Sequence, residues 1–175
     1  MTAKTKLIAA ATLALIISVV LGKLFVFTEA RKVHRTMLAL QEKISAPADG
    51  GGLDLAWYGA ALKPFFAPEV SVTINGGGDH WVFERDELLR VMVSVKHQNP
   101  ALTAAFAFTR KDITVSASAA TVSALVTVKN LNEPVEPQRL LIILYQGGDK
   151  KWRVATVKNP PDNKQPKDPD DETEH

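Results

Sequence analysis

A single long apolar run near the N-terminus constrains this chain more than any other feature. Residues 7–27, LIAAATLALIISVVLGKLFVF, contain one charged residue, Lys23. Twenty-one residues of helix at about 1.5 Å each extend about 31 Å, which matches a bilayer hydrocarbon core of about 30 Å. Lys23 lies near one end, where its aliphatic stem lets the ammonium group reach the headgroups. We expect residues 7–27 to be a transmembrane anchor in contact with the lipid bilayer, preceded by a short basic tail over residues 1–6.

A cleaved secretory signal is the alternative interpretation, because Lys4 and Lys6 provide a short basic start. The apolar run is long for a signal, and no small-x-small cleavage motif comes after it, so an uncleaved anchor is favoured. Arg31, Lys32 and Arg35 lie just after the run, and counting Lys and Arg alone favours a cytoplasmic body. A short tail with a signal-like start typically stays inside, and the rest of the chain is exported. We therefore expect a single-pass protein with an extracytoplasmic body.

Composition excludes several classes of function. A formal charge of +2 gives no reason to expect nucleic-acid binding, and the absence of cysteine excludes disulfides, thiol nucleophiles and thiolate zinc sites. The four histidines are scattered without HxH or HxxxH spacing, so we expect no metal site and no cofactor. Residues 160–175 are rich in proline and acidic residues and have no large apolar side chain. Such a segment cannot bury enough surface to offset its ordering entropy, so we expect a disordered tail.

The body, residues 28–159, begins with helical patterns. Val33, Met37, Leu40 and Ile44 recur at spacings of four, three and four, which predicts a helix over residues 28–44. A short second helix comes next, within LDLAWYGAALKPFFAPEV, and is closed by its prolines. The two helices precede the first strand-like segment of the chain.

A strand and a third helix come after them, separated by glycines. Alternating apolar residues predict a strand over residues 70–74, and Leu88, Val91, Met92 and Val95 predict a helix that Pro100 stops. The intervening NGGGDHWVFE lacks the GK[ST] of a phosphate loop, so we interpret the glycines as a corner where the chain doubles back.

The remainder of the chain is a run of strands. TAAFAFTRKDITVSA and TVSALVTVKN are succeeded by RLLIILYQ and KWRVATVKN, which flank a Gly-Gly-Asp hairpin signal. Helices preceding an antiparallel sheet indicate the α+β class.

This order of elements resembles the nuclear transport factor 2-like superfamily, which includes ketosteroid isomerase and SnoaL-type cyclases. The likeness rests on WYGAALKPFFAPEVSVTI (57–74), ERDELLRVM (84–92) and GGDKKWRVATVKN (147–159). Phe83-Glu84 depart from it, because many relatives place a glycine directly before the third helix. The resemblance implies a cone-shaped domain in which three helices pack on a curved antiparallel sheet.

The resemblance also implies which residues face the inside of the cone. From this resemblance we expect a pocket inside the cone, lined by Trp57, Phe106, Phe108, Val126, Ile143 and Tyr145. An enzyme of the isomerase or dehydratase kind needs a carboxylate or imidazole base there and a hydroxyl or acid donor. Tyr58, Asp79 and His80 are the weak catalytic candidates, and the strands over the interior carry no Asp, Glu or His. Trp81, next to the glycines, is the candidate partner contact.

We expect a membrane-anchored binding or assembly module that is not an enzyme. The alternatives are a small-molecule isomerase or dehydratase, and a carrier of a small apolar ligand in the cone pocket. Candidate partners are the lipid bilayer, a second copy of the chain or an envelope protein, because the resemblance extends to single-span envelope assembly proteins.

Overall fold

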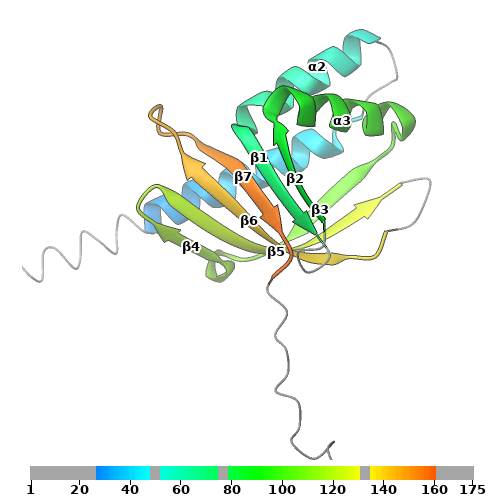
Figure 1. Cartoon of the computed structure of the whole chain (residues 1–175). Helices are drawn as coiled ribbons and strands as arrows, with labels where there is room; N and C mark the ends of the chain where they lie inside the picture. Colours follow the sequence, from blue (N-terminus) through cyan, green and yellow to red (C-terminus); the bar gives the residue numbers. More distant parts are fainter. Residues whose placement is uncertain (1–26, 48–51, 75–78, 131–134, 161–175) are drawn as a thin grey trace, which may run out of the picture.

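The computed structural model describes residues 27–47, 52–74, 79–130 and 135–160. They form one α+β domain in which helices pack on a curved sheet (Figure 1). After a helix over residues 27–45, the elements are α2 (Gly52–Leu62), the 3-10 helix η1 (Lys63–Phe65), β1 (Phe66–Ile74), β2 (Asp79–Glu84), α3 (Arg85–Gln98), β3 (Thr103–Ala107), the 3-10 helix η3 (Arg110–Asp112), β4 (Ile113–Ser116), β5 (Ala119–Lys129), β6 (Gln138–Gln146) and β7 (Trp152–Lys158).

The sheet is mixed rather than purely antiparallel as expected. Its strand order is β2-β1-β7-β6-β5-β3, with β4 also paired to β5, and β1 runs parallel to β7. The last strand of the chain is inserted between the first hairpin and β6, which makes that one pairing parallel. The expected hairpin between β6 and β7 is confirmed. The single strand expected over residues 103–117 is instead β3 and β4, which pair with opposite halves of β5.

The helix over residues 27–45 crosses the inner face of the sheet, behind it in Figure 1. Val33, Met37 and Leu40 are buried as the spacing predicted. The helix also covers the free edge of β3, because the Gln41 side-chain oxygen accepts from the Phe106 N–H at 2.6 Å and Ser45 bonds the backbone of Ala104. Side chains from the helix thus satisfy backbone groups that an edge strand otherwise exposes.

The segment between the glycines and α3 is a strand that the sequence interpretation missed. β2 pairs with β1 from Ile74↔Asp79 to Glu69↔Glu84, so the chain doubles back as expected, but as a hairpin. The glycine corner itself lies outside the described residues. Glu84 then precedes α3 as its N-cap residue, and α3 ends at Gln98, two residues before Pro100.

The buried face of α3 differs from the predicted stripe. Leu88 and Met92 pack against the core as predicted, but Val91 and Val95 are exposed, whereas Leu89 and Lys96 are buried. The contact face is therefore rotated around the helix from the prediction, because burial of one polar residue, Lys96, breaks the apolar pattern from which the stripe was inferred.

Among the described residues, no helix combines the length and the apolar character needed to cross a bilayer. The segment over residues 7–27, apart from Phe27, lies outside those residues. The anchor therefore stays a prediction.

Leu144 gives a test of the core. Its side chain is fully buried on β6, whereas Leu125 on the neighbouring β5 is 37% exposed. We expect Leu144→Ala to lower the free energy of unfolding by about 2–5 kcal/mol because it leaves a cavity. Leu125→Ala, the matched control, should cost less than about 1 kcal/mol. Urea unfolding of the full-length chain in mild detergent measures both, and equal losses would contradict the assigned packing.

Candidate functional site

The interior of the cone is occupied by side chains of the protein itself. One cluster of buried residues joins the 27–45 helix, α2, α3 and the sheet, and it includes Met37, Leu62, Val122, Leu144 and Val154. Phe106, Phe108 and Val126, three of the expected pocket-lining residues, are partly buried against this cluster. They act as packing groups at its periphery.

The other three expected pocket-lining residues lie elsewhere. Trp57 is 69% exposed on α2 and Tyr145 is 51% exposed on β6. Ile142 and Leu144 are in the core, so strand alternation directs Ile143 to the opposite face, together with Tyr145. The interior position predicted for these residues is wrong. In β6, five consecutive apolar residues, Leu140 to Leu144, conceal the period of two.

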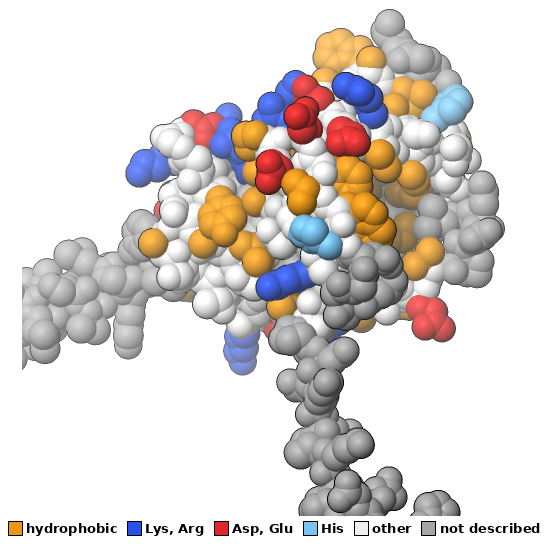
Figure 2. All heavy atoms as spheres, viewed as in Figure 1, with side chains coloured by type: hydrophobic (Ala, Val, Ile, Leu, Met, Phe, Trp, Pro, Cys, Tyr) orange, Lys and Arg blue, Asp and Glu red, His pale blue; other side chains and the backbone are white. Residues whose placement is uncertain are grey.

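The outer face of the sheet, turned toward the viewer in Figure 2, carries several exposed apolar side chains. Val82, Leu125 and Tyr145 are 51%, 37% and 51% exposed. Figure 2 shows apolar side chains on this face in several groups, with uncharged atoms and a few acidic, basic and histidine side chains between them. Association of two copies through the open sheet stays a prediction.

Tyr58, a weak catalytic candidate, is buried between helices. Its hydroxyl donates to the Ile44 carbonyl at 3.4 Å, and burial raises the pKa of Tyr58 to about 12. A hydroxyl with a raised pKa is a poorer proton donor than an ordinary tyrosine. The contact joins α2 to the end of the 27–45 helix, so a structural role accounts for it.

The other two candidates belong to β2. His80 is exposed, and its Nδ1 lies 2.9 Å from the Thr73 hydroxyl on the neighbouring strand. The backbone of Asp79 pairs with Ile74, while its side chain lies outside the described part. Trp81, the predicted partner contact, is 44% exposed. His80 therefore lies apart from Tyr58, which is in the core.

Lys96 is a buried cation that the sequence interpretation missed. Its side chain is almost fully buried, and its Nζ donates to the Leu102 carbonyl at 2.8 Å and to the Ile44 carbonyl at 3.5 Å. The ammonium group also lies 5.6 Å from the centroid of the Tyr58 ring. Burial lowers the pKa of Lys96. These contacts connect α3 with the 27–45 helix and the start of β3.

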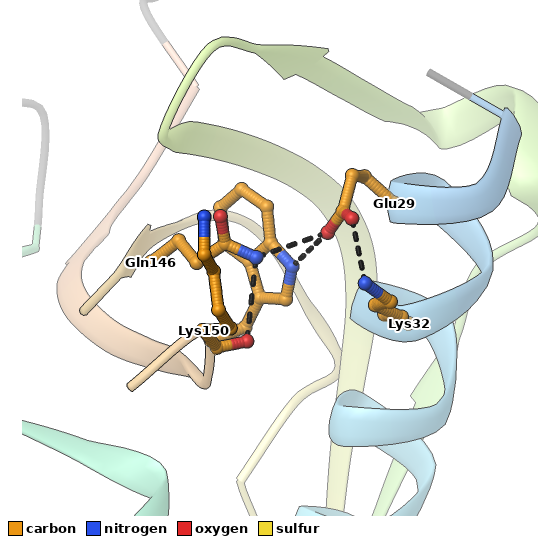
Figure 3. A network of polar contacts seen from close by, with 5 residues as sticks. Glu29, Lys32, Gln146 and Lys150 are labelled. Atoms are coloured by element: carbon orange, nitrogen blue, oxygen red, sulfur yellow. Dashed lines mark hydrogen bonds and ion pairs between the residues drawn. The ribbon is translucent and has the colours of Figure 1, made fainter. Parts of the chain in front are cut away.

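Glu29 is a buried carboxylate that was also missed (Figure 3). It accepts hydrogen bonds from Trp152 Nε1 at 2.9 Å, Gln146 Nε2 at 3.1 Å and Lys32 Nζ at 2.7 Å. Burial raises the pKa of Glu29, but these donors outweigh burial and hold it below the ordinary 4.5. The carboxylate is thus ionised and fully engaged. Its place in the first helical turn had concealed it, because acids there are usually solvated caps.

A cavity lies outside the cone, between α2 and α3. It has a volume of about 660 Å³. Its lining residues are Leu55, Ala56, Gly59, Ala60, Lys63, Asp86, Leu89, Arg90, Val93, Ser94 and His97. We call it the α2–α3 groove. The helices approach closely at Gly59, where an added Cβ would lie 3.2 Å from Val93 Cγ2.

The charged residues of the α2–α3 groove form a mixed rim. Lys63 Nζ lies 3.0 Å from Asp86 Oδ1 in an ion pair. Arg90 and His97 supply further basic groups. The Lys63 ammonium group is the main cause that lowers the pKa of Asp86. The groove therefore offers an apolar wall with a mainly basic polar rim.

A second cleft, of about 340 Å³, is basic. Lys32 and Arg35 of the 27–45 helix line it together with Lys150 and Lys151 from the turn before β7. Thr36, Pro64, Phe65 and Trp152 complete the lining. Within the described ranges, no group of three His, Cys, Asp or Glu residues is arranged to hold a metal ion.

Solved structures share the fold at low sequence identity. A proposed dehydratase of the nuclear transport factor 2-like family from Streptomyces avermitilis is 16% identical, with 75% of this chain and 94% of that chain covered and a TM-score of 0.51. A ketosteroid isomerase-like protein from Erwinia carotovora atroseptica is 19% identical, with 74% and 93% covered and a TM-score of 0.50. A nuclear transport factor 2-like protein of unknown function from Shewanella oneidensis is 16% identical, with 73% and 95% covered and a TM-score of 0.54.

No protein-family model matches the chain, and no curated protein does. At these identities the structural likeness concerns the fold alone. The expected α+β architecture is confirmed: the described domain has the nuclear transport factor 2-like fold.

Glu29 predicts an acid-sensitive stability. Because its pKa is lower in the folded protein, its stabilising contribution is present above pH 4.5 and is lost as the pH falls through the lowered value. We expect Glu29→Gln to lower the free energy of unfolding at neutral pH by about 1.5–3 kcal/mol. The difference in unfolding free energy between the wild type and Glu29→Gln should become smaller below pH 4.5. Glu42→Gln, on an exposed site of the same helix, is the control for urea unfolding across pH. If this difference in unfolding free energy did not change with pH, the negative charge of Glu29 would not contribute to stability.

Lys96 predicts a pH dependence of stability at alkaline pH, with the same sign as that of Glu29. Lys96→Met removes the donor to the Leu102 carbonyl, so we expect a loss of about 1–3 kcal/mol at neutral pH. Since burial lowers the pKa of Lys96, wild-type stability should rise relative to Lys96→Met as the pH approaches 10.5. The exposed Lys43→Met is the matched control. Equal stability of Lys96→Met and wild type at every pH would contradict the assigned contacts.

Proposed function

We propose that this chain is a membrane-tethered binding module that holds a small amphiphilic ligand in the α2–α3 groove and catalyses no reaction. The observation that carries the proposal is the location of free space in the domain. The cone interior is packed with core side chains, whereas a groove of about 660 Å³ opens on its helical layer. That volume lies within the range of about 300–1,000 Å³ typical of small-molecule sites.

The buried polar groups support a binding role over turnover. A general base must reach a substrate proton within about 3 Å. In the described residues, the Glu29 carboxylate and the Lys96 ammonium group each contact structural partners from several elements. Tyr58 donates to a backbone carbonyl. Each group is thus committed to holding the fold together.

The α2–α3 groove indicates the chemistry of its ligand. Small and apolar residues such as Ala60, Leu89 and Val93 favour a hydrocarbon or aromatic body. Arg90 and His97 at the rim favour one polar or anionic end, while Lys63 shares its charge with Asp86. We therefore propose a small amphiphile as the class of ligand. This places the carrier role in the helical layer rather than in the cone pocket.

The tether is the second part of the proposal. Residues 7–27 have the length and apolar character of a bilayer span. A domain held at a membrane surface has access to the amphiphiles that partition there. The names of two structural neighbours refer to dehydratase and isomerase chemistry, and an enzymatic role for this chain would need a base facing open space in its interior.

Filling the α2–α3 groove tests the proposal. Ala60 is exposed and lines the groove, so Ala60→Trp occupies the space without disturbing the core. The probe is anilinonaphthalene sulfonate, which combines apolar rings with one anion, and fluorescence titration uses the full-length chain in nanodiscs. We expect saturable binding above that of empty nanodiscs, weakened about tenfold or more, a loss of about 1.4 kcal/mol, in Ala60→Trp.

Ala107→Trp is the matched control, because Ala107 is an exposed alanine on β3 outside the groove. It should bind the probe as the wild type does. Equal weakening by both substitutions, or no saturable binding by the wild type, would contradict the assigned site.

A further inference from the structure

The basic cleft combines cations from two distant parts of the chain. Lys32 and Arg35 come from the 27–45 helix, and Lys150 and Lys151 come from the turn between β6 and β7. Phe65 and Trp152 supply apolar wall. Four cations around one cleft of about 340 Å³ repel one another, so an anionic occupant would be stabilised there.

The neighbouring carboxylates neutralise this cleft only in part. Glu29 pairs with Lys32 at 2.7 Å, and Asp149 pairs with Arg153. In the part of the chain that the structure describes, no carboxylate forms an ion pair with Arg35, Lys150 or Lys151. Arg35, Lys150 and Lys151 therefore have no ion-pair partner there and can contact an external anion, while Asp149 offsets part of the charge of Lys151.

An aromatic group flanked by arginines lies at the start of the same helix. Phe27 is 51% exposed, and the guanidinium carbons of Arg31 and Arg110 lie 5.0 and 5.8 Å from its ring centroid. Exposed aromatic and basic side chains are the combination found where proteins meet lipid headgroups. We call Phe27, Arg31 and Arg110, together with the basic cleft, the basic end.

The basic end adjoins the point where the apolar segment enters the domain. Residues 7–27 end at Phe27, where the described helix begins. Figure 1 shows the start of this helix and the turn between β6 and β7 on the same side of the molecule, with the end of α3 on the opposite side. An inserted segment would therefore hold the basic end within reach of the lipid surface.

We propose that the basic end docks on the anionic phospholipid surface of the membrane that residues 7–27 span. The inference rests on the tether of the proposed function and is independent of the groove. Headgroup phosphates supply the anion for the cleft, and Phe27 enters the interfacial region. Docking fixes the orientation of the domain, with the end of α3 directed away from the lipid.

Fluorescence quenching in vesicles tests the orientation. The chain has no cysteine, so Gly148→Cys accepts a single nitrobenzoxadiazole label, and a Cβ at Gly148 meets no atom within 4 Å. Gln98→Cys labels the exposed end of α3. The full-length chain is reconstituted in phosphatidylcholine alone or in three parts phosphatidylcholine to one part phosphatidylglycerol, with nitroxide-headgroup lipid as quencher. We expect quenching at position 148 in the anionic vesicles, and little at position 98.

Removing two cations measures the electrostatic contribution. Lys150 has a φ of 61°, a conformation that asparagine tolerates, so the test variant combines Lys150→Asn with Lys151→Gln. We expect its docking equilibrium to weaken about 25-fold, about fivefold for each cation. Lys43→Gln with Lys129→Gln, both exposed and outside the basic end, should dock as the wild type does. Salt of about 1 M should abolish docking, since it shortens the screening length to about 3 Å.

The outcomes separate docking from tethering. Retention on vesicles after an alkaline carbonate wash, without selective quenching at position 148, would overturn docking and leave the tether standing. Loss of the chain in that wash would overturn both. Release of docking by millimolar inorganic phosphate at constant ionic strength would assign the cleft to a free anion and overturn the lipid surface as its occupant.

Discussion

The buried carboxylate of Glu29 is the interaction on which the arrangement of the domain depends. It lies in the first described helix and accepts from the indole of Trp152, which is 123 positions later in the chain. The same carboxylate holds Gln146 and Lys32. A charge removed from water must be compensated by donors, and docking of the helix on β6 and β7 brings the Gln146 and Trp152 donors to this carboxylate. The network thereby fixes where the helix crosses the sheet.

That position has consequences for where the domain can bind anything. With Val33 and Met37 buried against the sheet, the cone that this architecture encloses is filled with side chains. Space remains instead between α2 and α3, where small residues including Gly59 line an apolar groove. Docking of the helix also brings Lys32 and Arg35 to the turn that carries Lys150. One helix placement accordingly creates both the packed interior and the basic cleft.

Much of the architecture could be predicted from local patterns. The spacing of Val33, Met37 and Leu40 identified a buried helix face, and the glycines before Lys150 identified a hairpin. Continuous apolar stretches were less informative: Ile143 and Ile142 look alike in sequence but lie on opposite faces of β6. The site was predicted least well. An acid and a lysine can be buried only if their partners are supplied from distant elements, and those partners are not evident from local sequence.

The amino-acid sequence alone determined the α+β class, the long apolar segment, the absence of thiol chemistry and most helix and strand positions, because these depend on composition and short-range periodicity. Tertiary structure decided the parallel pairing of β1 with β7, the burial of Glu29 and Lys96, and the position of the groove. Each of these features depends on contacts between residues far apart in the chain. The free energy of such contacts depends on which polar groups are buried together with their hydrogen-bond partners.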